Sequence, residues 1–284
     1  MRFPVKLAVA LAIMAVLAAI HVLSLLPGGG GGRGVVVGGV KWVNVTLLVD
    51  NNRGNISSLA SPWGLSIYVE TPSNRFLFDA DGSPEVLRRN AEILGVDLSK
   101  VDFVVVSHGH GDHVGGLALI AELKPRCRVY VPAGMDGRVK EWIAELGLEV
   151  VEVEDTAMVA EGVAVIGQLY GPPYEQAVAV KVEGLGLVLL VGCSHPGVEN
   201  LVYKASHDLN AEVYAVIGGF HLAGASPQRL ESTLNALLKQ GVKKIYPVHC
   251  SGDAFRSLVE SKRPELYGGG YVGLSVFFKA RASG

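Results

Sequence analysis

Four metal-capable side chains crowd one short segment, Ser107-His108-Gly109-His110-Gly111-Asp112-His113, which follows an apolar run. Neutral imidazoles and carboxylates are the usual ligands of zinc and related divalent ions, and the glycines let the backbone bend closely around a cation. In extended backbone, side chains two residues apart project to one side, so His108 and His110 can grip one ion together. Asp112 and His113 can hold a second. A solvated polar loop or ordinary core histidines would not explain this density, so the segment predicts a metal site.

The composition describes a large folded chain without a nucleic-acid partner. It has 284 residues, 49% of them hydrophobic, and a formal net charge of -2. That is enough for one substantial core or two small ones. Lys and Arg form no long run, so the positive surface that a nucleic-acid backbone requires is not expected. The three cysteines form no C-x-x-C pair and cannot all pair within the chain, so no disulfide framework is expected.

The amino terminus carries a candidate membrane span. Arg2 and Lys6 precede residues 7–26, an uncharged apolar stretch of about the length that crosses a bilayer as a helix. Its only small-residue cleavage site is poor and lies deep inside the run. The pattern favours an uncleaved anchor over residues 1–27, with a cleaved signal segment and a buried core helix as alternatives.

A glycine-rich stretch over residues 28–40 is typical of a linker between this anchor and a domain. Basic residues before the span indicate a cytoplasmic amino terminus, although Arg33 and Lys41 behind it weaken the bias. We expect a membrane-anchored protein whose catalytic domain, residues 41–284, faces outward.

From Lys41 onward short β-rich runs alternate with helical ones. Strands are expected at 42–49, 65–70, 75–78, 103–106, 128–131, 163–168, 177–182, 187–191, 213–217, 244–248 and 272–278. The turn Gly171-Pro172-Pro173 joins two of them as an antiparallel hairpin, which disfavours a purely parallel sheet. Helices are expected over 83–94 and 226–241, each opening on a Ser-Pro pair. The α/β class that fits best has two mixed sheets flanked by helices.

Three further histidines stand where an apolar strand runs into a turn, a common place for catalytic groups. They are His195, His221 and His249. Each alone could be structural, but the cluster at 108–113 lacks ligands, which favours their convergence on one site. His207 lies in a polar segment and is expected at the surface.

The H-x-H-x-D-H pattern from His108 to His113 resembles the signature of the metallo-β-lactamase superfamily. The αββα sandwich of that superfamily, with two β-sheets between helical layers, agrees with the strand and helix pattern after Lys41. Phe76-Leu77-Phe78-Asp79 resembles an earlier motif of the superfamily, whose aspartate orients the metal site from behind the ligands. The resemblance gives Asp79 that role.

Further blocks in order resemble the dihydropteroate-synthase-like subgroup of that superfamily. They are Leu48-Val49-Asp50-Asn51-Asn52, Gly64-Leu65-Ser66, Gly192-Cys193-Ser194-His195-Pro196-Gly197, Gly218-Gly219-Phe220-His221-Leu222 and Pro247-Val248-His249-Cys250. The resemblance implies two metal ions with three ligands each. The ligands of the first would be His108, His110 and His195, and those of the second Asp112, His113 and His249. His221 falls where many members carry a bridging aspartate, and would bind one metal, contact substrate or donate a proton.

Two divalent ions, zinc by default, are opposed by one carboxylate ligand, so the centre favours anionic substrates such as phosphoesters, diphosphates or carboxylates. A metal lowers the pKa of bound water to about 7, and Asp112 can orient or deprotonate the nucleophile. These features predict a hydrolase acting through metal-bound hydroxide, with Asp112 and His221 as catalytic residues.

Two further sets of residues lie near the proposed ligands in the sequence, and each has a structural interpretation besides a functional one. Cys193 and Cys250 flank proposed ligands, but free cysteines are commonly buried packing residues, and we expect packing here. Asp50, Asn51 and Asn52 could contact substrate or simply form a turn.

Two other functions compete with the hydrolase. An archaeal member of the resembled subgroup is assigned as a synthase that joins a dihydropterin-methyl diphosphate to a ribofuranosylaminobenzene phosphate. Those substrates are cytoplasmic, which the apparent anchor disfavours. The third possibility is a membrane-tethered metal-binding module without catalysis, disfavoured by the near-complete ligand set. Substrate identity and oligomeric state stay open.

Overall fold

Two mixed β-sheets face each other in the computed structural model, which describes residue 35 and residues 37–280. The first contains, in spatial order, β13 (Ser275–Lys279), β1 (Trp42–Val49), β2 (Ser66–Glu70), β3 (Arg75–Phe78), β4 (Phe103–Val105), β5 (Arg128–Pro132) and β6 (Glu149–Val153). The second contains β12 (Lys244–Val248), β11 (Val213–Gly219), β10 (Gly186–Val191), β9 (Tyr174–Val182), β8 (Val163–Tyr170) and β7 (Ala157–Ala160). Neighbours are parallel from β3 to β6 and from β10 to β12, and antiparallel elsewhere.

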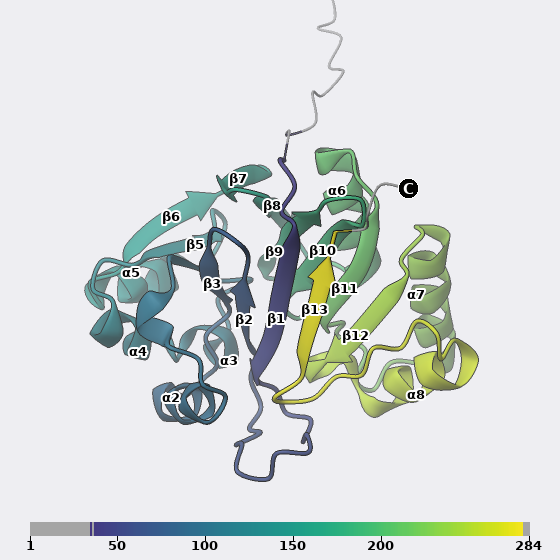
Figure 1. Cartoon of the computed structure of the whole chain (residues 1–284), viewed down its shortest axis with the longest axis horizontal. Coiled ribbons are helices and arrows are strands. Elements are labelled where there is room, and N and C mark those ends of the chain that lie inside the picture. Colours follow the sequence, from purple (N-terminus) through teal and green to yellow (C-terminus); the bar gives the residue numbers. More distant parts are fainter. Residues whose placement is uncertain (1–34, 36, 281–284) are drawn as a thin grey trace, which may run out of the picture. The chain divides into compact units, whose positions relative to one another are not determined.

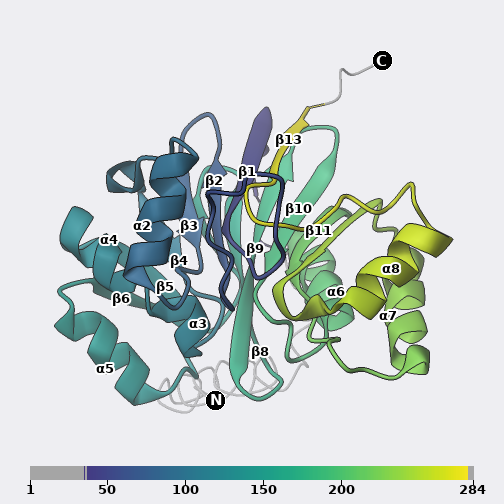
Figure 2. The same ribbon diagram turned by 90° about the horizontal axis from the view of Figure 1, so that it is seen from below.

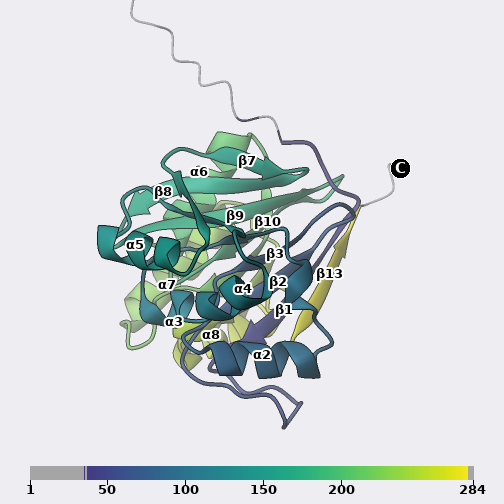
Figure 3. The same cartoon turned by 90° about the vertical axis from the view of Figure 1, so that its left-hand side faces the viewer.

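Helices cover the outer face of each sheet (Figures 1 and 2). The first sheet is covered by α2 (Pro84–Ile93), α3 (Gly111–Val114), α4 (Leu117–Leu123) and α5 (Gly137–Glu145), seen from their own side in Figure 3. The second is covered by α6 (Val198–Leu209), α7 (Pro227–Lys239) and α8 (Asp253–Lys262). The αββα sandwich expected from the sequence is confirmed.

The core between the sheets follows from the two-residue period of strands, which sends successive side chains to opposite faces. In β4, Phe103 and Val105 point to the other sheet, whereas Val104 points to the helices. Phe103 stacks on Phe76 with ring centroids 5.0 Å apart and meets the edge of Tyr130 at 5.6 Å. This aromatic group holds three adjacent parallel strands in register beneath the loop that follows β4.

The eleven expected strands are all present within a few residues, including the β8–β9 hairpin. The last begins at Ser275 rather than Val272, because Gly273 takes a left-handed backbone (φ 85°) that interrupts the extension. Two strands, β6 and β7, escaped prediction. Each is the outermost strand of its sheet, so most of its residues are exposed or only partly buried and its apolar pattern is weak.

Both expected helices are capped as their Ser-Pro pairs predict. The hydroxyl of Ser83 accepts from the backbone N–H of Val86 at the start of α2, and that of Ser226 accepts from Arg229 at the start of α7. The other helices were not individually predicted.

The predicted membrane span, residues 7–26, lies outside the described residues. Within the part of the chain that the structure describes, no helix has the length and apolar character to cross a membrane. The carboxyl end of the predicted linker contacts the fold: Val37 and Val40 are buried, and Val40 forms a β-bridge with Val182, the last residue of β9.

Truncating the aromatic group should test the inter-sheet core. Replacing Phe103 by Ala removes a ring that is 2% exposed, and we expect a loss of about 3 to 5 kcal/mol in the free energy of unfolding, measured with urea. Phe277 is 58% exposed on the outer strand β13, and its replacement by Ala should cost below about 1 kcal/mol. Equal losses in both variants would contradict this account of the core.

Candidate metal centre

The metal-capable side chains come from loops after four strands. His108 and His110 follow β4, and His110 precedes the short helix α3 that carries Asp112 and His113. The other three each follow one of the neighbouring strands β10, β11 and β12 in the opposite sheet, and are His195, His221 and His249. Parallel strands end at one edge of a sheet, which explains why residues far apart in sequence meet here.

Three histidines form the first ligand group. The ligating atoms of His108, His110 and His195 all lie within 4.8 Å of one another. Nε2 of His108 is 3.0 Å from Nδ1 of His110, close to the separation of about 3.3 Å that two nitrogens adopt on one tetrahedral zinc ion. The predicted partnership of the loop with His195 is thus present in the geometry.

Asp112, His113 and His249 form the second group, again within 4.8 Å. Oδ2 of Asp112 is 3.3 Å from Nε2 of His249 and 3.7 Å from Nε2 of His113. Nε2 of His249 is buried and has no hydrogen-bond partner among the described residues. A buried nitrogen without a partner is costly unless an ion or water satisfies it, so the group fits a metal ion.

Asp79 anchors the histidine loop from below. Its carboxylate is fully buried and accepts from the backbone N–H and the hydroxyl of Ser107 and from Nδ1 of His113, each at 2.7 Å. The hydroxyl of Ser107 is also 2.8 Å from Nδ1 of His108. Because Nδ1 of each histidine is engaged from behind, Nε2 of both faces the centre, the orientation that a metal ligand needs. The carboxylate thus lies in the position expected of it.

Glu175 anchors His195 from behind, as Asp79 anchors His113. This role of Glu175 was not predicted from the sequence. Glu175 lies near the start of β9, fully buried, and accepts from Nδ1 of His195 at 2.8 Å and from the backbone N–H groups of Ser194 and His195. The signal available was a Glu-Gln pair entering an otherwise apolar strand, because a buried carboxylate requires partners.

Asp50 and Asn51 anchor His249. Asp50 is buried and accepts from the backbone N–H of His249 at 2.8 Å, and Oδ1 of Asn51 is 3.2 Å from Nδ1 of the same residue. Asn52 donates to Asp50. The sequence left open whether residues 50 to 52 contact substrate or form a turn. Asp50 instead positions a histidine.

The protonation of the centre differs between its two ligand groups. Burial, and then the charges of neighbouring histidines, lower the pKa of His108 well below its ordinary value. Burial has the same direction for His113, but the charge and hydrogen bond of Asp79 outweigh it and raise the pKa of His113 to about 9. Burial would raise the pKa of Asp112, yet the close contact with the His249 side chain and the charge of His113 lower it. A metal ion must displace a proton from His113, whereas His108 is already neutral.

Several residues around the centre hold left-handed backbone, which is uncommon outside glycine. They are Asp79 (φ 58°), Ser194 (φ 60°), His221 (φ 51°) and His249 (φ 48°). Each costs free energy that the surrounding hydrogen bonds must offset, and such conformations gather at functional sites.

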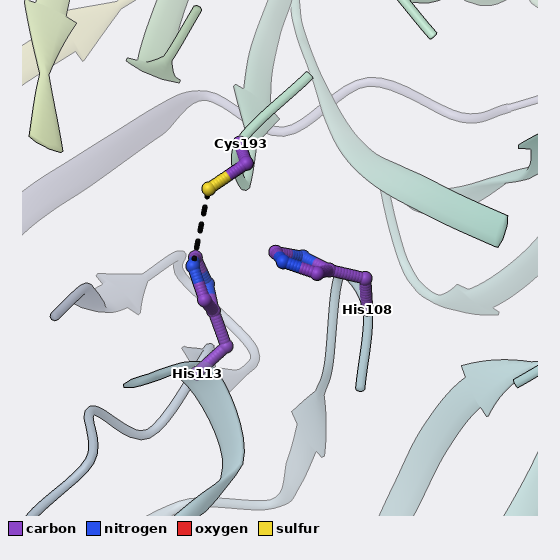
Figure 4. A group of neighbouring side chains, drawn as sticks. All are labelled: His108, His113 and Cys193. Carbon is purple, nitrogen blue, oxygen red and sulfur yellow. Dashed lines mark hydrogen bonds between the residues drawn. The ribbon is translucent and has the colours of Figure 1, made fainter. Parts of the chain in front are cut away.

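The structure places His221 beside His195 but groups its ligating atom with two cysteines. The His221 ring is tilted against that of His195, with ring centroids 4.6 Å apart, and its ligating atom groups with Cys193 and Cys250. Cys193 itself also groups with His108 and His113, one residue from each ligand group. Figure 4 shows its sulfur and the two imidazoles pointing into one space. Cys193 thus lies near a histidine of each ligand group, whereas His221 groups with the two cysteines.

Two more residues complete the surroundings. Trp63 was not identified from the sequence; it is 58% exposed and its ring lies 4.7 Å from that of His249, so an exposed aromatic side chain lies beside one of the ligand histidines. His207 lies exposed on α6, as expected.

Comparison with known proteins now defines the class. Residues 74–169 match the family model described as the beta-lactamase superfamily domain. Over 265 residues the chain is 31% identical to the 7,8-dihydropterin-6-methyl-4-(beta-D-ribofuranosyl)-aminobenzene-5'-phosphate synthase of Methanocaldococcus jannaschii. The alignment covers 76% of this chain and 90% of that relative. The chain belongs to the metallo-β-lactamase superfamily, in the subgroup of that synthase.

Solved structures agree with this fold. One described as Tm1679, a metal-dependent hydrolase of the beta-lactamase superfamily, has a TM-score of 0.70 and 24% identity and covers 84% of this chain and 99% of its own. A diphosphatase from the PhnP family has a TM-score of 0.58 and 16% identity, covering 84% of this chain and 98% of its own. At these identities the similarity establishes the shared fold.

Asp81 supplies a test of the electrostatics beneath the centre. It is 1% exposed, its Oδ1 has no hydrogen-bond partner among the described residues, and burial raises its pKa to about 6. Because this value exceeds the ordinary 3.8, the folded state binds the proton more tightly. The contribution of Asp81 to stability is therefore highest below pH 4 and is lost as the pH rises through 6.

Replacing Asp81 by Asn keeps the shape and suits the left-handed backbone at this position (φ 61°). In chelator-treated protein, the unfolding free energy of the variant should exceed that of the parent by about 1 to 3 kcal/mol above pH 7. The difference should shrink toward zero below pH 4. A difference that does not change with pH, measured by urea denaturation, would refute the burial argument.

Proposed function

We propose that this protein is a dinuclear-metal-dependent hydrolase acting on an anionic small molecule bearing a phosphoester, diphosphate or carboxylate. The observation that carries the proposal is the pairing of two three-residue ligand groups, in which four of the five histidines are anchored from behind. His108, His110 and His195 would hold one ion, and Asp112, His113 and His249 the other. Zinc is the default, because histidine-rich tetrahedral sites suit it.

When bound, divalent ions supply Lewis-acid chemistry: they lower the pKa of water to about 7 and neutralise charge that develops on the substrate. The protein contributes orientation. Asp112 is partly exposed, and its low pKa makes its carboxylate an acceptor that orients an attacking water. His221 is exposed beside His195, so it can reach substrate and deliver a proton to a leaving group.

Anion selectivity follows from where the charges lie. Asp112 is the one carboxylate within the two ligand groups, whereas Asp79 and Glu175 are fully buried behind the histidines. Those buried carboxylates reduce the net positive charge, but a substrate reaching the centre meets the ions first. Electrostatic attraction falls with distance, so an anionic substrate is still favoured.

Removing a ligand should abolish both metal content and turnover. We expect Asp112→Ala or His110→Ala to lose bound metal, measured by elemental analysis of purified protein, and to lose all turnover of phosphoester and diphosphate substrates. His207→Ala, at an exposed position on α6, serves as the matched control and should keep both. Full activity in a variant shown to be metal-free would exclude the proposal.

The second candidate is a transferase, because the relative in Methanocaldococcus jannaschii is named as a synthase of 7,8-dihydropterin-6-methyl-4-(beta-D-ribofuranosyl)-aminobenzene-5'-phosphate. An electropositive centre that stabilises a diphosphate leaving group would serve that reaction too. The membrane anchor proposed from residues 7–26, with an outward-facing domain, disfavours it, since those substrates are cytoplasmic. A reporter fused at Gly284 that proves cytoplasmic would favour the transferase.

An assay without acceptor separates the two activities directly. A hydrolase releases diphosphate or phosphate from an ester substrate in water alone, whereas a transferase requires an arylamine acceptor. We expect phosphate or diphosphate to be released without an acceptor, at a rate that added acceptor leaves unchanged. A phosphate-detection assay measures this rate. Release that begins only when acceptor is added would establish the transferase.

A further inference from the structure

Cys193 lies between the two ligand groups rather than in ordinary packing. Its Sγ is within 4.8 Å of the ligating nitrogens of both His108 and His113 and is 3.4 Å from Nε2 of His113 (Figure 4). A sulfur and a nitrogen bound to one tetrahedral zinc ion are about 3.6 Å apart, given bonds of about 2.3 and 2.0 Å. The observed distance is therefore close to that of two ligands sharing an ion.

The loop that carries Cys193 is held rigidly. The backbone N–H of Ser194 donates to Glu175 at 2.7 Å, and its hydroxyl donates to the carbonyl of Gly219 at 2.7 Å. A Cβ on Gly192 would lie 2.1 Å from the hydroxyl of Ser107, so only glycine lets the loop approach the histidine segment this closely. The sulfur is thus aimed by the same buried groups that orient the histidines.

Cys250 stands behind Cys193. Its Sγ lies 3.6 Å from the carbonyl oxygen of Cys193 and accepts from the backbone N–H of His221 at 3.3 Å. The sulfur of Cys250 lies within 4.8 Å of the ligating atoms of Cys193 and His221, but it forms no such group with His108 or His113. Of the three cysteines, Cys193 is the one whose sulfur reaches histidines of both ligand groups.

We infer that Cys193 is a seventh metal ligand, a thiolate shared between the two metal positions in place of a bridging carboxylate. The inference rests on the proposed dinuclear function. On coordination the thiol gives up its proton to solvent and forms sulfur–metal bonds, as coordinating cysteines do. The thiolate adds one negative charge between the ions, which lowers the net positive charge of the centre. It also favours metals that accept sulfur ligands, such as zinc, cobalt or iron.

Cobalt(II) reports sulfur ligation directly, through a charge-transfer absorption band in the near ultraviolet that nitrogen and oxygen ligands do not produce. We expect the full-length protein loaded with cobalt to bind two ions and to show this band. Cys193→Ser should lose the band completely, and Cys193→Asp should lose it while keeping two ions, because a carboxylate can also bridge. Cys127→Ser, on the far side of the first sheet, and Cys250→Ser should both retain the band.

The outcomes separate this inference from the proposed function. Two bound ions without the band in the parent protein would overturn the thiolate ligand alone, and so would a band that persists in Cys193→Ser. A parent protein that binds no cobalt, zinc or manganese would overturn both. Circular dichroism of each variant establishes that loss of the band does not reflect unfolding.

Discussion

The centre depends on one buried carboxylate. Asp79 follows β3, is fully buried, and receives hydrogen bonds from Ser107 and His113. Through the hydroxyl of Ser107 it also orients His108. One residue of each ligand group is thereby held by the same side chain, so their relative placement is set before any ion arrives. Its left-handed backbone (φ 58°) shows that the fold accepts local strain for this purpose.

Glu175, on β9 of the second sheet, holds the ring of His195 in the same way, while Asp50 and Asn51, just after β1 of the first sheet, hold the backbone and the ring of His249. Hydrogen-bond acceptors beneath the imidazoles fix which ring nitrogen carries the proton, and so leave the opposite nitrogen free for a metal. The same buried carboxylates would offset part of the charge of any metal ions bound there. The same buried side chains therefore orient the ligands and reduce the positive charge of the centre. The αββα architecture places these side chains where its two sheets meet.

Most of the architecture could be predicted because it rests on local patterns. Alternating apolar runs predicted eleven strands, and Ser-Pro pairs predicted the starts of α2 and α7. The omitted strands β6 and β7 are outer strands, whose half-exposed residues leave little periodicity. The metal groups were predictable for a similar reason: H-x-H-x-D-H is a local pattern, and each later histidine follows an apolar strand.

By itself the sequence determined the type of ligands, their placement at strand ends and the class of fold, since these follow from short-range spacing. Only the tertiary structure decided how the ligands are held and what lies between them. Cys193 meets His113 across 80 positions of sequence, and Asp50 meets His249 across 199. Contacts of that kind have no periodicity along the chain; they arise when two sheets pack face to face and bring the ends of separate strands together.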